Sequence, residues 1–438
     1  MLSLKPTNVH EIIGRHLLAD GLDLVFDHRR SQGSYLYDSR DGRRYLDMYS
    51  FFASQPIGFN HPRMTDPAFR EKMADVAIQK PSNSDVYTLE MAEFVETFAR
   101  IGIPQELPHL FFVSGGTLAV ENALKASFDW KVRKNLAKGL DETRGGKVIH
   151  FREAFHGRSG YTLSLTNTEW RKVGYFPKFD WPRILNPKIQ FPLEDHLESV
   201  VAAEAQAIQE IERAVADNPD DIAALILETI QGEGGDNHFR PEFFQALREL
   251  ADEHEFMFIL DEVQTGVGLT GKMWAYEHFG IVPDMICFGK KMQVCGFLAS
   301  ERIDEVEDNV FALSSRINST WGGNLVDMVR CQRYLEIFEE EKLVEHAAEV
   351  GDHLLTGLRH FQEENPKRIA NSRGRGLMCA FDLETTEARD AMHQRIYELG
   401  MLVLKCGERS IRFRPTLNVT REDIDVGVGI LEKAIASA

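Results

Sequence analysis

The stretch that decides the fold is Phe258-Ile259-Leu260-Asp261-Glu262-Val263-Gln264-Thr265-Gly266-Val267-Gly268. It is an apolar run that ends abruptly in acids and glycines, as a buried strand does when it enters a loop. In an open parallel sheet, ligands bind beyond the carboxyl ends of the strands, so Asp261 is expected to project into a crevice. Taken alone, the pattern also fits an aspartate that merely caps a turn, which is the commoner case.

A second apolar run, Met285 to Phe288, leads into Gly289-Lys290-Lys291, so Lys290 follows Asp261 by 29 residues (290 minus 261). An isolated lysine at such a place is usually a surface lysine. A lysine and an aspartate at two strand ends, however, match what pyridoxal phosphate requires. The amine forms a Schiff base, and the carboxylate keeps the pyridine nitrogen protonated.

The surrounding chain alternates short apolar runs with amphipathic stretches from about residue 109 onward. This alternation predicts βα units that build a mostly parallel sheet, and therefore a large α/β domain. The expected strands are His109 to Val113, Val148 to Phe151, Ala223 to Glu228, Phe256 to Leu260 and Met285 to Phe288. The expected helices include Val120 to Lys138, Leu197 to Ala216 and Pro241 to His254.

The two ends of the chain predict a smaller α+β domain. Residues 33–47 read as a β-hairpin with Asp41-Gly42 at its turn, and a long helical region is expected from Leu325 to about Glu364. The remaining tail alternates strands and helices, expected at Gly376 to Leu383, Ala388 to Leu399, Leu402 to Leu404, Ser410 to Arg414 and Glu422 to Ala436. We therefore expect an N-terminal segment of the small domain (1–70), a large domain (71–330) and a C-terminal small domain (331–438).

Composition excludes several classes of function. Of the 438 residues, 43% are hydrophobic and 27% are charged, and the formal net charge is -18. The acidic balance disfavours nucleic-acid binding, and no apolar stretch has the length of a membrane span. Five widely spaced cysteines indicate neither a disulfide framework nor a metal site. The segment Met1 to Pro6 lacks an apolar export signal, so a cytoplasmic location is expected.

Two further motifs follow expected strands. Phe111-Phe112-Val113-Ser114-Gly115-Gly116-Thr117 runs from a strand through small residues into a helix, where backbone N–H groups can approach a phosphate. Phe155-His156-Gly157-Arg158 offers an aromatic face beside a guanidinium. Either motif alone also fits a structural loop.

Together these motifs resemble the class III aminotransferases, over nearly the whole chain from about Gly33 to about Ile430. The resemblance also includes, in family order, Gln231-Gly232-Glu233-Gly234-Gly235, Ser319-Thr320-Trp321-Gly322-Gly323-Asn324 and Ile411-Arg412-Phe413-Arg414-Pro415. It implies a fold type I pyridoxal-phosphate-dependent transferase, aspartate aminotransferase-like, with its active site at the interface of a homodimer.

The resemblance assigns a role to each motif. Lys290 is implied to be the Schiff-base lysine, Asp261 the partner of the pyridine nitrogen and Gln264 the partner of the ring hydroxyl. Phe155 is implied to stack on the ring. The phosphate is expected to be held by Gly115, Gly116 and Thr117, with Thr320 contributed by the neighbouring subunit. Many relatives carry one more hydroxyl in the phosphate loop than this chain does.

The resemblance also implies the substrates. Arg412 is expected to bind a carboxylate on the reacting carbon, Glu233 to neutralise Arg412 when an ω-amino substrate is bound, and Arg158 to hold the distal carboxylate. The segments after Lys290 and around Glu233 favour transfer of the 6-amino group of L-lysine to 2-oxoglutarate. That reaction gives 2-aminoadipate 6-semialdehyde and L-glutamate. Ornithine and 4-aminobutyrate stay open as alternative amino donors, and a mutase, a racemase or a catalytically silent cofactor-binding protein fits less well.

Overall fold

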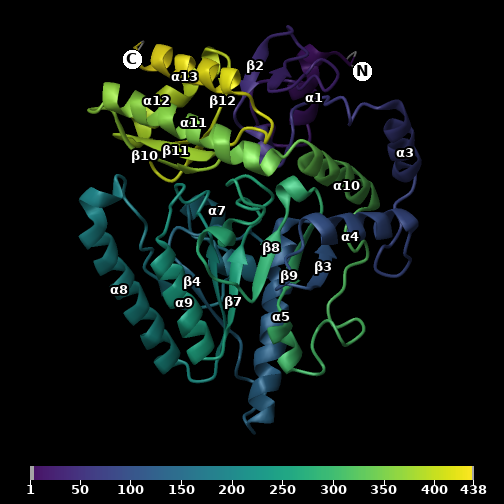
Figure 1. Cartoon of the computed structure of the whole chain (residues 1–438), viewed down its shortest axis with the longest axis vertical. Helices are drawn as coiled ribbons and strands as arrows, with labels where there is room; N and C mark the ends of the chain where they lie inside the picture. Colours follow the sequence, from purple (N-terminus) through teal and green to yellow (C-terminus); the bar gives the residue numbers. More distant parts are fainter. Residues whose placement is uncertain (1–3, 437–438) are drawn as a thin grey trace.

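The structure, a computed structural model, describes residues 4–436. The largest sheet has seven strands in the order β3-β9-β8-β7-β6-β4-β5, and two smaller sheets have four and three strands. Figure 1 shows the large sheet in the lower part of the molecule. The N-terminal (purple) and C-terminal (yellow) segments lie beside each other at the top.

The large sheet contains all five strands expected from the sequence, with boundaries that agree to within one residue. In spatial order its strands are β3 (His109–Val113), β9 (Cys295–Ala299), β8 (Met285–Phe288), β7 (Met257–Asp261), β6 (Ile222–Glu228), β4 (Lys147–Phe151) and β5 (Arg183–Ile184). The pairs from β8 to β5 are parallel, whereas β9 runs antiparallel to both β8 and β3. Strands β9 and β5 were not expected, because β9 is short and contains a glycine and β5 has only two residues.

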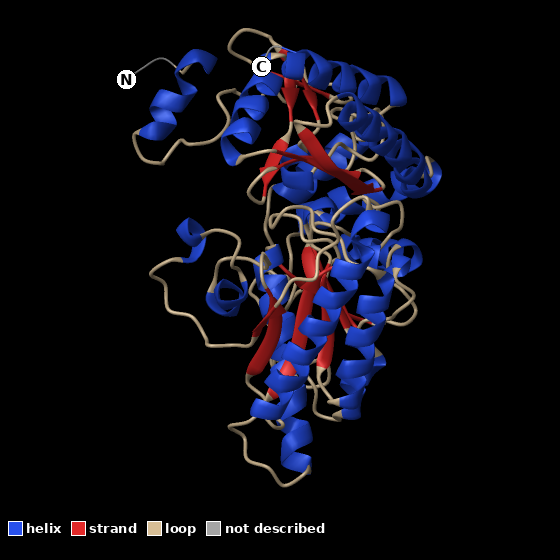
Figure 2. Ribbon diagram, turned by 90° about the vertical axis from the view of Figure 1, so that its left-hand side faces the viewer, coloured by secondary structure: helices blue, strands red, loops and turns tan. Residues whose placement is uncertain are grey.

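Helices cover both faces of this sheet, which explains why its central strands are apolar up to the acids that end β6 and β7. Successive side chains of a strand point to opposite faces. Accordingly, Leu225 and Leu227 join the core that includes α9, while Ala224 and Ile226 join the core that includes α5. Figure 2 shows long helices running alongside the strands. The large-domain helices are α4 (Leu89–Ile101), α5 (Gly116–Ala137), α6 (Gly160–Leu165), α7 (Trp170–Val173), α8 (Leu193–Asp217) and α9 (Pro241–Glu253).

The three-stranded sheet joins the two ends of the chain, whereas the four-stranded sheet is formed by the C-terminal part alone. Strand β12 (Met401–Leu402) pairs in parallel with β2 (Arg44–Asp47), which pairs with β1 (Tyr35–Tyr37) as the expected hairpin. The other sheet has the order β10 (Ile369–Arg375), β11 (Met378–Leu383), β14 (Ser410–Phe413) and β13 (Leu404–Cys406). The expected association of the two chain ends is therefore present. The domain boundaries near residues 70 and 330 stay predictions.

The helical region expected from Leu325 to about Glu364 is present, whereas one expected strand of the C-terminal part is wrong in detail. The helical region from Leu325 is two helices, α10 (Leu325–Glu340) and α11 (Leu343–Glu364), because Lys342 adopts a φ of 52° and breaks the first helix. The expected strand Leu402 to Leu404 is split between β12 and β13, which belong to different sheets.

The other helices are α1 (Val9–Gly14), α2 (Ser50–Ala53), α3 (Pro67–Ala77), α12 (Thr386–Glu398) and α13 (Arg421–Ala436), with 3₁₀ turns η1 (Pro6–Asn8), η2 (Ala275–His278), η3 (Lys290–Met292) and η4 (Glu301–Glu305).

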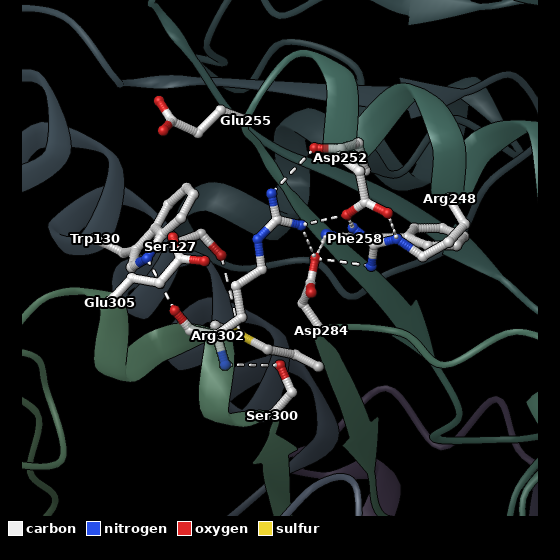
Figure 3. Close-up of polar contacts among 12 residues, drawn as sticks. Ser127, Trp130, Arg248, Asp252, Glu255, Phe258, Asp284, Ser300, Arg302 and Glu305 are labelled. Atoms are coloured by element: carbon white, nitrogen blue, oxygen red, sulfur yellow. Dashed lines mark hydrogen bonds and ion pairs between the residues drawn. The ribbon is translucent and has the colours of Figure 1, made fainter.

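A buried aspartate joins the strands at the amino end of the sheet, opposite to the edge that carries Lys290. Asp284 Oδ2 accepts hydrogen bonds from Phe258 N at 2.7 Å and Arg302 Nη1 at 3.1 Å, and it lies 3.0 Å from Arg248 Nη1 (Figure 3). Burial raises the pKa of Asp284, and the two arginines oppose that shift. The cluster connects the beginnings of β7 and β8 to α9 and η4.

Replacing Asp284 with asparagine should therefore lower the free energy of unfolding by about 2 kcal/mol, because two partly buried guanidinium groups lose their shared carboxylate. Urea-induced unfolding measures the loss. The matched control is Asp252→Asn, since Asp252 contacts the same arginines from an exposed position, and its effect should stay below about 0.5 kcal/mol. Equal losses in the two variants would contradict a special role for the buried carboxylate.

Candidate active site

A cavity of about 490 Å³ lies at the carboxyl edge of the large sheet. Lys290 follows β8, Asp261 ends β7, Glu228 ends β6, Phe155 follows β4, and Gly116 begins α5. All five line this cavity. The carboxyl ends of parallel strands meet at one edge of a sheet, so residues far apart in the sequence share one space.

Lys290 is placed to present a reactive amine. Burial lowers the pKa of Lys290, with a further contribution from Arg412, while Asp261 and Glu228 oppose the shift. The residue adopts a φ of 46°, an unfavourable backbone conformation for a side chain other than glycine. An amine with a lowered pKa is more often unprotonated near neutral pH, as a nucleophile or a general base must be.

Asp261 is held in one orientation by two donors. Its Oδ2 lies 2.8 Å from His156 Nδ1, and its Oδ1 accepts a hydrogen bond from Val263 N at 3.1 Å. Because a carboxylate accepts, the proton of this contact belongs to Nδ1. His156 is buried, and its Nε2 has no hydrogen-bond partner among the described residues. His156 therefore positions the carboxylate inside the cavity.

The segment expected to bind phosphate lies at the amino end of α5, a helix of 22 residues. Gly115 caps the helix with a φ of 115°, and a Cβ there would meet no atom within 4 Å. Gly116 and Thr117 line the cavity. A Cβ on Gly157 would lie 2.3 Å from Thr117 Oγ1, so only glycine allows the turn after β4 to approach this loop. The amino end of a helix is a favourable site for an anion.

Gln264 is oriented by two buried arginines. Its Oε1 accepts hydrogen bonds from Arg414 Nε and Nη2, both at 3.1 Å, and from Arg412 Nη1 at 3.4 Å. Arg414 is in turn paired with Asp236 through two contacts of 2.9 and 2.5 Å. Since the amide oxygen is engaged by the arginines, the amide nitrogen of Gln264 is the group left to donate toward the cavity.

Glu233 and Arg412 form the ion pair that the sequence motifs implied. Arg412 Nη2 donates to Glu233 Oε2 at 2.6 Å, although 179 residues separate the two. Glu233 Oε1 contacts Lys172 Nζ as well. Burial alone would raise the pKa of Glu233, but Arg412 and Lys172 together hold it below its ordinary value. The carboxylate is therefore charged at neutral pH, and Arg412 is covered.

Most of the predicted site residues meet at this cavity. Those that line it are Gly116, Thr117, Phe155, Arg158, Glu233, Asp261, Gln264, Lys290 and Arg412, and Gly115 directly precedes them. Thr320 is not brought to the cavity of its own chain. It lies in an exposed segment, where its carbonyl oxygen accepts hydrogen bonds from Ser82 Oγ and Ser84 Oγ.

The cavity also contains residues for which the sequence motifs implied no role. Glu228, whose pKa burial raises to about 7, accepts hydrogen bonds from Phe155 N and Gly232 N. It thereby joins the turn after β4 to the loop that carries Glu233. Glu228 could have been predicted as a site residue, because it ends β6 as Asp261 ends the neighbouring strand β7, in register with it. Lys172 could not have been predicted in this way, because it lies in an ordinary charged stretch of the sequence.

Phe52 reaches the cavity from an unusual turn. Ser50, Phe51, Phe52 and Ala53 all adopt left-handed φ values between 40° and 67°. Asp47 Oδ1 accepts hydrogen bonds from the backbone nitrogens of residues 49 and 50, and Lys291 Nζ donates to Ala53 O at 2.9 Å. Lys291 thus ties this turn to the segment that carries Lys290.

The residues of the cavity fit pyridoxal phosphate. A buried amine and an aspartate line the same space, open room lies before the amino end of a long helix, and Phe155 supplies an aromatic face. Among residues 4–436, no group of three or more His, Cys, Asp or Glu side chains is arranged to hold a metal ion, and all five cysteines are free thiols. No helix within that range has the length and apolarity that crossing a membrane demands.

Comparison with known proteins gives a consistent result. Residues 19–435 match the family model described as aminotransferase class-III. The L-lysine-epsilon aminotransferase of Mycobacterium tuberculosis is 52% identical over 431 residues, covering 98% of this chain and 96% of that protein. The human mitochondrial 4-aminobutyrate aminotransferase is 33% identical over 424 residues, covering 91% and 82%. A solved structure of the lysine aminotransferase from M. tuberculosis, in the internal aldimine form, has a TM-score of 0.97 at 52% identity and covers 99% of this chain and 100% of that one.

The sheet order, the lysine after β8 and the aspartate that ends β7 define a fold type I enzyme of the pyridoxal-phosphate-dependent class. Within that class, the chain belongs to the class III aminotransferases. The resemblance in the sequence motifs is thereby confirmed.

Proposed function

We propose that this enzyme transfers the 6-amino group of L-lysine to 2-oxoglutarate, giving 2-aminoadipate 6-semialdehyde and L-glutamate, with pyridoxal 5'-phosphate as cofactor. The observation that carries the proposal is the Glu233–Arg412 ion pair in the cavity that also contains Lys290 and Asp261. An enzyme that uses both an ω-amino donor and a 2-oxo acid needs an arginine that can be covered and uncovered. The relatives named L-lysine-epsilon aminotransferase, 47% to 52% identical, support lysine as the donor.

Each residue has a defined task in this reaction. The cofactor, when bound, supplies an aldehyde that captures the amine and a ring that accepts electrons from the reacting carbon. Lys290 would hold the cofactor between turnovers and then move a proton from the amino-bearing carbon of the substrate. Asp261, oriented by His156, would hold a proton on the ring nitrogen, while Gln264 donates to the ring hydroxyl. Phe155 would pack on the ring, with Gly115, Gly116 and Thr117 around the phosphate.

The ion pair would select between the two substrates. Lysine has no carboxylate on its reacting carbon, so Glu233 stays on Arg412 and neutralises it. 2-Oxoglutarate has a carboxylate at that position, which would replace Glu233. Arg158, exposed at the cavity wall, would hold the distal carboxylate of either substrate. That group is the α-carboxylate of lysine or the side-chain carboxylate of 2-oxoglutarate.

Ornithine and 4-aminobutyrate are the alternative donors, since the same residues serve any ω-amino acid. A panel of amino donors with 2-oxoglutarate decides the question. Lysine should give the highest kcat/KM, and the cofactor absorbance band should bleach with lysine and return with 2-oxoglutarate. A higher kcat/KM for ornithine or 4-aminobutyrate would overturn the choice of lysine.

A homodimer with Thr320 supplied across the interface belongs to the same proposal. Val86, Tyr87 and Leu89 are 59% to 76% exposed and directly follow Ser82 and Ser84, which contact Thr320. Clustered exposed apolar side chains mark protein interfaces. Sedimentation of the wild-type protein tests whether it is a dimer. The Thr320→Ala variant should retain the cofactor less well while staying dimeric.

Glu233→Gln tests the substrate selection. The substitution should slow the lysine half-reaction by on the order of a hundredfold or more, because Arg412 is then buried without an anion. The 2-oxoglutarate half-reaction should be unchanged or faster, since its own carboxylate pairs with Arg412. Stopped-flow absorbance at the cofactor band measures each half-reaction separately.

Two further variants complete this test. Arg412→Ala should show the opposite bias, and Arg158→Ala should impair both half-reactions because both substrates place a carboxylate there. Equal slowing of the two half-reactions in Glu233→Gln would reduce Glu233 to a structural acid.

A further inference from the structure

Glu233 lies between two cations, of which Arg412 is only one. Lys172 Nζ contacts Glu233 Oε1, the oxygen that Arg412 leaves free, and it also lies 2.7 Å from Glu169 Oε1. The four side chains form a line of alternating charge. Their exposed fractions change from 1% for Arg412 through 24% and 21% for Glu233 and Lys172 to 56% for Glu169. The line therefore connects the buried arginine to solvent.

Lys172 comes from a different part of the fold than Arg412. It lies on α7 and lines the cavity, with its Nζ 5.8 Å from the centre of the Phe155 ring, whereas Arg412 belongs to β14 of the four-stranded sheet. The two cations are thus held independently. A carboxylate that leaves Arg412 still has a cation beside its other oxygen.

We propose that Lys172 is a positioning residue, which holds Glu233 when a substrate carboxylate takes its place on Arg412. The inference rests on the proposed function, in which Glu233 covers and uncovers that arginine. Rotation about the Oε1 contact would let Glu233 leave Arg412 without becoming an unpaired charge in a partly buried site. Lys172 would thereby set the relative affinity of the cavity for the two substrates.

The direction of the effect follows from counting partners in each state. In the covered state, in which Glu233 pairs with Arg412, the carboxylate contacts both cations, so the loss of Lys172 leaves it one partner. In the uncovered state, in which a substrate carboxylate occupies Arg412, Lys172 would be the only cation in contact with Glu233, so its loss leaves Glu233 without a partner. Removing Lys172 therefore destabilises the uncovered state more, and it should weaken the binding of any ligand with a carboxylate at Arg412. Glu169 competes for the same ammonium group, so removing its charge should act in the opposite direction.

The test uses the holoenzyme and glutarate, a dicarboxylate that has no amino or oxo group and cannot react. In Lys172→Met, the dissociation constant of glutarate by calorimetry and the KM for 2-oxoglutarate should rise about tenfold. The lysine half-reaction should be impaired less than glutarate binding, because Glu233 keeps its contact with Arg412 when lysine is bound. Glu169→Gln should tighten glutarate binding by about two- to threefold. Lys172→Arg, which keeps the cation, should restore most of the affinity.

Arg171→Met is the matched control, because Arg171 is exposed on the same short helix and its loss removes the same charge. It should leave glutarate binding unchanged. The decisive comparison places Lys172→Met in a Glu233→Gln background, where its effect on glutarate should vanish. A tenfold weakening that persists there would overturn the proposal, since Lys172 would then contact the ligand itself.

Equal weakening of lysine and glutarate in the single Lys172→Met variant would overturn it too. Failure of the proposed function would give results that differ from failure of the Lys172 proposal. It would appear as a better donor than lysine for the wild-type enzyme, or as equal slowing of both half-reactions in Glu233→Gln alone. Glutarate binding to the Lys172 variants does not depend on which amine is the natural donor.

Discussion

Replacing Lys290 with alanine is expected to abolish turnover, with a loss of at least about 10⁴-fold in kcat. By the proposed function, the variant would lack both the amine that holds the cofactor and the base that moves the proton. No other lysine can replace it, because Lys291 points away and donates to Ala53 O, and Lys172 is engaged by Glu233 and Glu169. Single-turnover kinetics with lysine measure the loss, and circular dichroism checks that the fold is intact.

A covalent label gives an independent check on Lys290. Borohydride reduction of the wild-type holoenzyme should fix the cofactor on Lys290, and peptide mapping should find it there. A label on Lys291 would refute the assignment. Added small primary amines should restore part of the proton-transfer rate in Lys290→Ala, because they can enter the space that the side chain leaves.

The second large effect is expected for Asp261→Asn, which should keep the cofactor yet lose activity by more than about a thousandfold. An amide cannot stabilise a proton on the ring nitrogen as a carboxylate does, so the ring would accept electrons poorly. The contact with His156 Nδ1 survives, because the amide oxygen still accepts a hydrogen bond. Retention of the cofactor is measured by absorbance after gel filtration, and activity by the single-turnover rate of the lysine half-reaction.

Asp261→Glu is the companion variant, since it keeps the charge and shifts its position. Asp261→Glu should recover part of the rate that Asp261→Asn loses. Near-normal deamination of lysine by Asp261→Asn would rule out the electrostatic role and leave Asp261 as a structural partner of His156.

The class of fold could be predicted because its signals are local. Each central strand is a short apolar run, and each βα unit repeats the same alternation, so the five expected strands agree with the structure to within one residue. Asp261 and Lys290 could be placed because both follow such runs directly. Strand β9 could not be predicted, since a short segment with a glycine at 296 differs little from a loop until β3 and β8 pair with it.

The break between α10 and α11 shows a second limit. Residues 325–364 have helical composition throughout, yet Lys342 adopts a left-handed conformation and the second helix packs on β10 and α13. Similarly, only Val403 separates β12 from β13 in the sequence, but the two strands belong to different sheets. In both cases packing against distant strands and helices decides where one element ends.

The sequence by itself determined the class of fold, the edge of the sheet at which chemistry occurs and the residues that motifs place there. These features depend on the order of side chains within about a dozen positions. The tertiary structure alone decided the polar pairs for which no motif implied a partner. Lys172 and Glu233 are 61 residues apart, and His156 and Asp261 are 105 apart. The pair of Glu233 and Arg412, 179 residues apart, was implied by the motifs, and the structure added its geometry. Such pairs meet because separate parts of the fold converge on one cavity. A hydrogen bond or ion pair needs its atoms within about 4 Å of each other, and the order of residues along the chain does not give that distance.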